Sequence, residues 1–121
     1  LRIVDAAGAV SAPVEGVPAV QAGGQGGLLD VVPSPRFASD RTVFLSYVEP
    51  TDDGARTAVA RGTLEGTTLR DVRVVFRQRP APSGRHHFGS RLVFDRDGRG
   101  LHDKAAGTAV VRTRALPSIA A

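Results

Sequence analysis

Hydrophobic and polar side chains alternate along much of the first 100 residues, a pattern typical of β-strands. In residues 42–49 both sets of alternate positions are largely apolar, which predicts a strand covered on both faces. Residues 72–78 and 91–95 alternate apolar with more polar positions, which indicates strands with one wetter face. Residues 28–32 and 57–64 complete the set, and the small side chains of 57–64 predict close approach of a neighbouring sheet.

Turns rich in glycine separate these strands. Asp52-Asp53-Gly54, Glu65-Gly66 and Asp97-Gly98 supply residues that accept the positive φ of hairpin turns. Strands joined in order by such turns form an antiparallel meander, the unit that β-propellers repeat as a blade. Because a blade buries its faces against its neighbours, repeat architectures generally need about three or more units.

We therefore predict an all-β fold, a partial β-propeller of about one and a half blades, with residues 91–95 opening the second blade. The alternative is a small closed barrel or sandwich of about six or seven strands. No stripe of helical period long enough for a helix occurs before residue 100.

Composition fits a single ordinary domain of 121 residues, with 41% hydrophobic and 23% charged residues. No apolar run approaches the ~18 residues that a membrane-spanning helix needs. Fifteen of the sixteen basic residues are arginine, so the pI of about 10.9 overstates how basic the surface is. The basic residues are scattered among acids, and the chain has no Trp and one Tyr, which argues against nucleic-acid binding. The absence of Cys excludes disulfides and thiolate chemistry.

Several catalytic and ligand-binding motifs are excluded by single positions. The glycine run 23–27 is not a dinucleotide fingerprint, because Leu29 stands where a third glycine is needed. The stretch that begins at Asp95 resembles half of a calcium loop, but Ala106 occupies the position of the required bidentate glutamate. No Gly-x-Ser-x-Gly motif supports a serine hydrolase.

The three histidines are poor candidates for a shared metal site. His86 and His87 are adjacent, and neighbouring residues in a strand point to opposite faces, so these two cannot easily share one metal, and His102 is the third histidine. We predict no metal ligands in this chain.

Two polar segments stand directly before predicted strands: Gln25 within its glycine run, and residues 83–90 with His86 and His87. In a blade, the entrances of the innermost strands line the mouth of the central channel, where ligand sites are built on a rigid scaffold. These segments are therefore the candidate site, with a structural role for the histidine left as the alternative.

The order and spacing of several motifs resemble the bacterial soluble aldose sugar dehydrogenases of the glucose/sorbosone dehydrogenase family over about residues 1–100. The motifs are Gly24-Gln25-Gly26-Gly27-Leu28-Leu29-Asp30-Val31, Pro35-Arg36-Phe37-Ala38, Phe44-Leu45-Ser46-Tyr47, Thr57-Ala58-Val59-Ala60-Arg61, Val75-Phe76-Arg77-Gln78 and His87-Phe88-Gly89-Ser90-Arg91-Leu92-Val93-Phe94-Asp95.

The resemblance implies a six-bladed propeller that binds pyrroloquinoline quinone (PQQ) and calcium at its axis and oxidises the anomeric hydroxyl of aldoses to a lactone. His87 matches the family's catalytic base, and Gln25 matches a glutamine beside cofactor and sugar. Two positions depart from the family pattern: His86 replaces an acidic or amide residue, and Ser90 replaces a frequent glycine.

After Gly100 the sequence no longer follows the family, so the ligands that the family supplies downstream for PQQ and calcium are not expected in this chain. We divide the chain into residues 1–25, the end of a preceding blade and a loop; 26–80, one four-stranded blade; 81–100, the site loop and the first strand of the next blade; and 101–121, a non-matching tail. The hypothesis is a truncated or frame-shifted dehydrogenase fragment, inactive in isolation.

The second hypothesis is a non-catalytic interaction module, in which a partial propeller self-associates or binds a partner through exposed blade edges. A third is a chain without function that is degraded. The resemblance implies an aldose as substrate and a periplasmic or secreted location, while the sequence shows no leader before Leu1.

Overall fold

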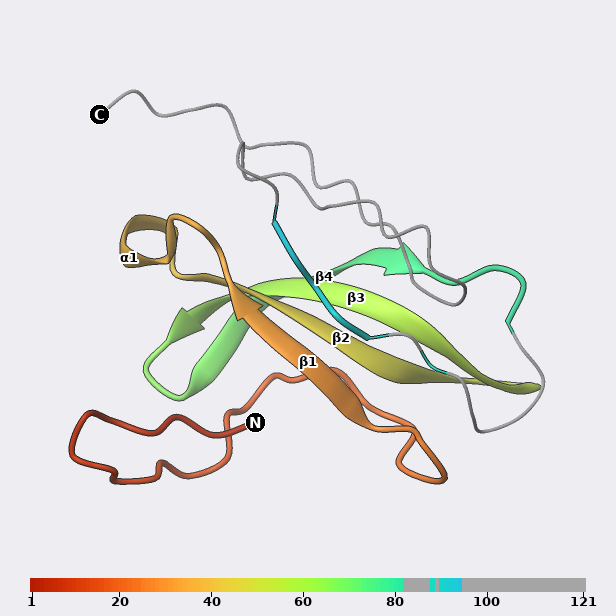
Figure 1. The fold of residues 1–121 in the computed structure, drawn as a ribbon, viewed down its shortest axis with the longest axis horizontal. Helices are drawn as coiled ribbons and strands as arrows, with labels where there is room; N and C mark the ends of the chain where they lie inside the picture. The colour runs from red at the N-terminus through yellow and green to blue at the C-terminus, as the bar shows by residue number, and fades with distance from the viewer. Residues whose placement is uncertain (82–87, 89, 95–121) are drawn as a thin grey trace.

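A computed structural model describes residues 1–81, 88 and 90–94 of the chain. Its centre is one antiparallel sheet of four strands in the order β1-β2-β3-β4 (Figure 1). The strands are β1 (Leu28–Pro33), β2 (Thr42–Thr51), β3 (Gly54–Glu65) and β4 (Thr68–Arg77), and the one-turn helix α1 (Phe37–Asp40) lies between β1 and β2. The predicted meander is confirmed.

Tight turns join the last three strands. The β2–β3 pairing continues to Thr51 opposite Gly54, and the β3–β4 pairing continues to Glu65 opposite Thr68. Gly66 takes a φ of 59° in the second turn, a conformation that glycine adopts without steric cost. Both hairpins fall at predicted turns.

Asp40 organises the longer connection between β1 and β2. Its carboxylate accepts hydrogen bonds from the Ser34 hydroxyl and from the backbone N–H of Thr42, each at 2.8 Å. The four residues of α1 form a single turn held by these contacts, which explains why no helical stripe marks it in the sequence.

Strand β2 is covered on both faces, as predicted. Its six consecutive residues from Val43 to Val48 are all buried. On one face Val43 and Leu45 pack with Val14 and Leu69, and apolar side chains of the N-terminal segment, residues 1–20, pack against this cluster. On the opposite face Phe44 contacts Phe94 in an edge-to-face arrangement with ring centroids 5.2 Å apart.

The small residues of β3 allow close packing, although the neighbour is not another sheet. A Cβ added at Gly62 would lie 2.6 Å from Cγ of Leu69, so Leu69 of the adjacent strand occupies the space that glycine leaves. Ala58 and Ala60 are fully buried beside Tyr47. The close contact at Gly62 is therefore made by a side chain of β4 in the same sheet, and not by the neighbouring sheet that the small residues predict.

The N-terminal segment is fixed to the far edge of the sheet. The N–H of Glu15 donates to the carbonyl of Thr67, and the N–H of Leu69 donates to the carbonyl of Glu15. The segment continues along the sheet to Gln21, whose N–H donates to the carbonyl of Val48. It thus forms a layer beneath one face, as Figure 1 shows.

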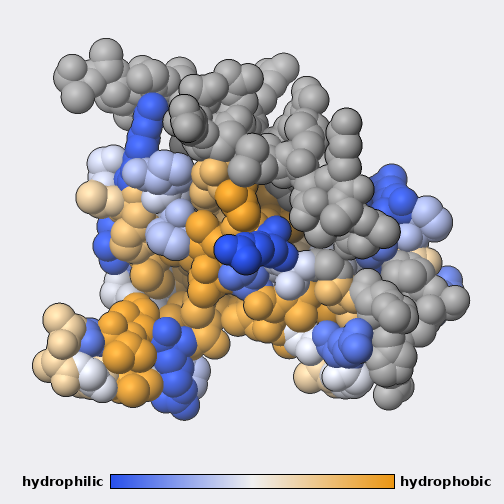
Figure 2. Space-filling model, in the orientation of Figure 1, coloured by the Kyte–Doolittle hydropathy of each residue, from blue (hydrophilic) through white to orange (hydrophobic). Residues whose placement is uncertain are grey.

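The strand predicted at 91–95 is not a regular strand in the part that the structure describes. Within residues 90–94, Phe94 alone takes part in a β-bridge. The N–H of Leu92 donates to the side chain of Asp30 instead of to a neighbouring strand. The segment therefore lies on the sheet as an extended layer. Figure 2 shows that apolar residues gather over the middle of this side of the molecule.

Candidate functional site

Gln25 lies exposed in a tight turn directly before β1. The turn is closed by a hydrogen bond from the N–H of Gly26 to the carbonyl of Gly23 at 2.9 Å. A Cβ at Gly26 would stand 2.3 Å from the carbonyl oxygen of Gln21, so the turn requires glycine at that position. The glycine run is thus a structural requirement of the turn that presents Gln25.

Both ends of this turn are attached to one residue of β2. Val48 accepts a hydrogen bond from Gln21 on one side of the turn, and its N–H donates to the carbonyl of Gly27 on the other. The Val48 side chain is fully buried, so the attachment point belongs to the rigid core. Gln25 is therefore held at a defined place, as a ligand-binding side chain requires.

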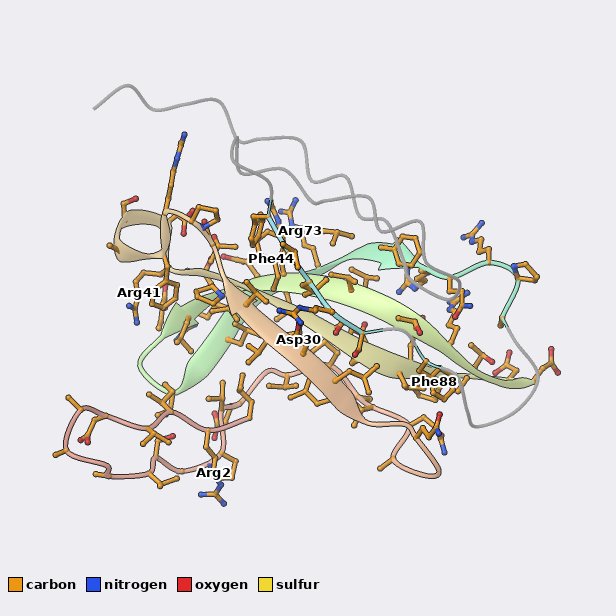
Figure 3. The ribbon with its side chains drawn as sticks, viewed as in Figure 1. Arg2, Asp30, Arg41, Phe44, Arg73 and Phe88 are labelled. Carbon is orange, nitrogen blue, oxygen red and sulfur yellow. The ribbon has the colours of Figure 1, made fainter. Side chains whose placement is uncertain are left out.

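His87 lies outside the described residues, as do His86 and His102. Its neighbours on the C-terminal side, Phe88 and residues 90–94, are described. Figure 3 draws Phe88 at the end of the sheet where β1 begins, and Asp30 and Phe44 along the path of the segment that follows. The part of the chain next to His87 thus approaches the end of the sheet from which the Gln25 turn enters β1.

Two polar side chains hold residues 90–92 on the sheet. The Ser46 hydroxyl donates to the carbonyl of Ser90, and the N–H of Leu92 donates to Oδ2 of Asp30 at 2.8 Å. Ser46 and Asp30 are direct partners in the β1–β2 register. A hollow of about 460 Å³ lies between β1 and this segment. Its lining consists of Leu29, Asp30, Val32, Ser90, Arg91 and Leu92.

Sequence reasoning missed the hydrogen bonds by which Ser46 and Asp30 hold residues 90–92. The signal was present: an acid and a small hydroxyl interrupt otherwise apolar strands, and such residues are rarely buried without a partner. Serine at position 90, where the family often has glycine, does not affect this contact. The Ser46 hydroxyl donates to the backbone carbonyl of residue 90, and the side chain of residue 90 is not involved.

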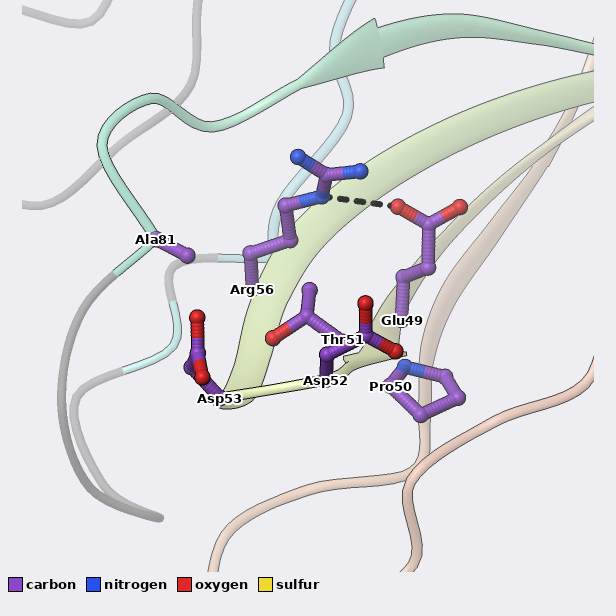
Figure 4. A pocket seen from close by; sticks show the side chains of 7 residues that line it. All are labelled: Glu49, Pro50, Thr51, Asp52, Asp53, Arg56 and Ala81. Atoms are coloured by element: carbon purple, nitrogen blue, oxygen red, sulfur yellow. Dashed lines mark hydrogen bonds and ion pairs between the residues drawn. The ribbon is translucent and has the colours of Figure 1, made fainter.

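A second polar cluster lies at the other end of β2. The Glu49 carboxylate accepts hydrogen bonds from Nε of Arg56 at 2.8 Å and from Nε of Arg77 at 3.0 Å. The ion pair between Arg56 and Glu49 borders an open cavity of about 680 Å³ (Figure 4). The cavity is lined by Glu49, Pro50, Thr51, Asp52, Asp53, Arg56 and Ala81.

Burial alone would raise the pKa of Glu49, but the hydrogen bonds from Arg77 and Arg56 outweigh it and hold that pKa below its ordinary value of 4.5. Burial, and then the negative charge of Glu49, raise the pKa of Tyr47 above 10.0. The cluster therefore keeps Glu49 ionised and Tyr47 neutral at physiological pH. Its geometry is that of an ion pair between strands, which stabilises the sheet.

Among the residues that the structure describes, no group of three or more His, Asp or Glu side chains is placed to hold a metal ion. In the same part of the chain, no helix is long and apolar enough to cross a membrane. Gln25 is the one predicted cofactor contact that the structure describes, and a single amide does not make up a binding site for PQQ.

A four-stranded antiparallel meander of this kind is the unit that β-propellers repeat as a blade. The sequence matches the family model Glucose / Sorbosone dehydrogenase over residues 1–106. The chain belongs to this family, and its all-β, partial-propeller fold agrees with that of its relatives.

Three relatives show the extent of the similarity. The chain is 54% identical over 101 residues to the aldose sugar dehydrogenase YliI of Escherichia coli K12, covering 81% of this chain and 27% of the relative. A solved glucose dehydrogenase superposes with a TM-score of 0.79 at 45% identity, covering 82% of this chain and 32% of that one. The PQQ-bound aldose sugar dehydrogenase of Streptomyces coelicolor superposes with a TM-score of 0.68 at 30% identity, covering 82% and 29%.

The chain thus spans about a third or less of the length of these relatives. The bound PQQ in the Streptomyces structure belongs to that protein.

Proposed function

We propose that this chain supplies one blade, with His87 and Gln25, to a PQQ-dependent dehydrogenase that oxidises the anomeric hydroxyl of aldoses to lactones. The observation that carries the proposal is the family match over residues 1–106, which includes both residues. The rigid attachment of the Gln25 turn to Val48 supports it, because a substrate-orienting amide must be held in place.

The chemistry assigns a separate role to each side chain. His87 accepts the proton of the anomeric hydroxyl, a role for which an imidazole is suited because it can both accept and release a proton. The Gln25 amide donates and accepts hydrogen bonds at once and orients the sugar. In the complete enzyme, PQQ would supply the two-electron acceptor for the hydride that leaves this carbon as the C=O bond of the lactone forms.

The remaining parts of the site follow from the family and are proposals for this chain. Calcium would be held with PQQ by residues that the described part of this chain does not contain. Because the chain spans less than a third of its E. coli relative, we propose that the 121 residues alone show no quinone-dependent turnover. We also propose a periplasmic location and a role in carbohydrate metabolism.

A chimera tests the proposal. The matched segment of the E. coli aldose sugar dehydrogenase is replaced by the corresponding residues of this chain, and PQQ-dependent dye reduction is measured with an aldose. We expect turnover in the chimera and a loss of about 100-fold or more in kcat for His87→Ala. Gln25→Ala should lower kcat/KM, because it removes an orienting contact.

Arg36→Ala is the matched control, since Arg36 is exposed at the opposite end of β1 from the Gln25 turn and should leave kcat unchanged. An active chimera in which His87→Ala keeps full turnover would exclude His87 as the base. A chimera that folds and binds PQQ but never reduces the dye would exclude the function itself.

The second candidate is a non-catalytic module that binds through its sheet edges. Its support is the exposure of one valine on each outer strand, Val31 on β1 at 43% and Val75 on β4 at 38%. This candidate predicts assembly that increases with concentration and does not require PQQ.

A further inference from the structure

We propose that Asp30 and Ser46 are positioning residues that fix the main chain of residues 90–92 and, through it, the placement of His87. Leu92 follows His87 by five residues and Asp30 follows Gln25 by five residues. The hydrogen bond from Leu92 to Asp30 therefore joins the two segments that carry the candidate site. The part of this inference that concerns catalysis rests on the proposed function of His87.

A β-bulge places Asp30 for this task. Leu28 pairs with Tyr47, but the next β1 residue in register with β2 is Asp30, opposite Ser46, so Leu29 is the extra residue. In an unbroken ladder Asp30 would pair with Leu45 and point to the apolar face that the N-terminal segment covers. The bulge turns the carboxylate to the face on which residues 90–94 lie.

The two side chains perform complementary tasks. The Asp30 carboxylate accepts from the N–H groups of Val31 and Leu92, at 2.9 and 2.8 Å, while the Ser46 hydroxyl donates to the carbonyl of Ser90. They replace the hydrogen bonds that a neighbouring strand would make to residues 90 and 92. Ser46 is 1% exposed, so the hydroxyl that donates to Ser90 belongs to the packed core of the sheet.

The edge-to-face contact between Phe44 and Phe94 fixes the far end of the same segment. The chain after His87 is thus held at three successive alternate positions: 90, 92 and 94. Alternate positions of an extended segment face the same side, so all three contacts can form together. The anchored stretch begins three residues after His87 in the sequence, so we propose that it constrains where that histidine can lie.

Hydrogen exchange on the 121-residue chain tests the anchor without reference to activity. In Asp30→Ala, we expect amide exchange in the peptide covering residues 90–94 to accelerate about tenfold or more, because Leu92 loses its acceptor. Asp30→Asn keeps an acceptor oxygen and should retain most of the protection. Asp53→Ala, which removes an exposed acid from the β2–β3 turn, should leave this peptide unchanged.

Unchanged exchange of residues 90–94 in both Asp30→Ala and Ser46→Ala would overturn the anchor. Far-UV circular dichroism and the exchange of β3 peptides show whether each variant keeps its sheet. If Asp30→Ala does not fold, Ser46→Ala carries the test, because alanine is close in shape to serine and removes the hydroxyl that donates to the carbonyl of Ser90.

The catalytic part is tested in the chimera described above. Asp30→Ala should lower kcat about tenfold with little change in KM, with recovery in Asp30→Asn. In a His87→Ala background, Asp30→Ala should have no further effect on kcat, since a residue that acts through His87 has nothing left to position. Equal losses with and without His87 would show that Asp30 acts on stability alone.

The outcomes distinguish the positioning role of Asp30 and Ser46 from the proposed function of His87. If exchange shows the anchor but His87→Ala leaves kcat intact, the proposed function of His87 fails and the link to catalysis fails with it. If His87→Ala abolishes turnover while Asp30 variants alter neither exchange nor kcat, the function stands and the positioning role is wrong.

Discussion

Two arginines from different strands converge on the carboxylate of Glu49. Arg56 lies directly opposite Glu49 in the β2–β3 register, and Arg77 reaches it from β4. The Glu49 side chain is only 16% exposed, whereas the pair between Glu65 and Arg70 is more than half exposed on both sides. Screening by water therefore weakens the second pair far more than the first.

We predict that Glu49→Gln destabilises the chain by about 1–2 kcal/mol at about pH 7. The pKa of Glu49 is lowered in the folded state, so its contribution is complete above 4.5 and is lost as the pH falls through the folded value. Urea unfolding of both proteins should give curves that differ at about pH 7 and converge as the pH falls below the lowered pKa of Glu49.

Glu65→Gln is the matched control and should change stability by less than about 0.5 kcal/mol. A difference in unfolding free energy between wild type and Glu49→Gln that persists unchanged into acid would show that the ionised carboxylate is not what stabilises the sheet.

The role proposed for Asp30 could not be predicted from the sequence. It depends on one extra residue in β1, which a pattern of alternation does not reveal.

Among the elements, the four strands of the meander could be predicted because each carries its own alternation and each is bounded by turn residues. Two strands begin earlier than predicted: β3 begins at Gly54 and β4 at Thr68, while their apolar patterns begin at 57 and 72. Backbone pairing continues into the turn without needing apolar side chains. At 91–94 the alternation correctly predicted alternate burial, and among these residues Phe94 alone takes part in a β-bridge. An extended segment lying on a sheet shows the same alternation as a regular strand.

Strand β3 offers a direct test of how its small residues matter. Gly62→Ala should cost about 1–3 kcal/mol, because the new Cβ would lie 2.6 Å from the branch point of Leu69. Leu69→Ala alone should also destabilise, by about 2–4 kcal/mol, through the cavity it leaves. In the double variant the two costs should not add, because the alanine at 62 enters space that Leu69 has vacated.

Denaturant unfolding of the four proteins gives the coupling energy. Strict additivity would mean that Gly62 and Leu69 do not compete for the same space. A large cost of Gly62→Ala that remains in the Leu69→Ala background would instead assign the effect to the strand's backbone.

At the scale of the whole molecule, the sheet is layered on both faces but carries two outer strands, β1 and β4. Both are interrupted: β1 by the bulge at Leu29, and β4 by register shifts opposite Val59–Ala60 and Arg61–Thr63. Exposed arginines at positions 70, 73 and 77 line β4. Bulges and charges are the devices that prevent addition of another strand to an edge.

We therefore predict that the chain sediments mainly as a monomer and that Arg73→Val makes it associate. The substitution would create the uncharged run Val72-Val-Val74-Val75-Phe76 on an outer strand, a composition that favours strand addition. Sedimentation velocity over about a hundredfold range of concentration measures the effect. Arg36→Val, away from the sheet edge, should stay monomeric. The prediction is wrong if the wild type itself assembles as its concentration rises and Val31→Lys abolishes that assembly. A charge on β1 would act only where another chain docks, so this result would identify the sheet edges as binding surfaces and support the interaction-module hypothesis.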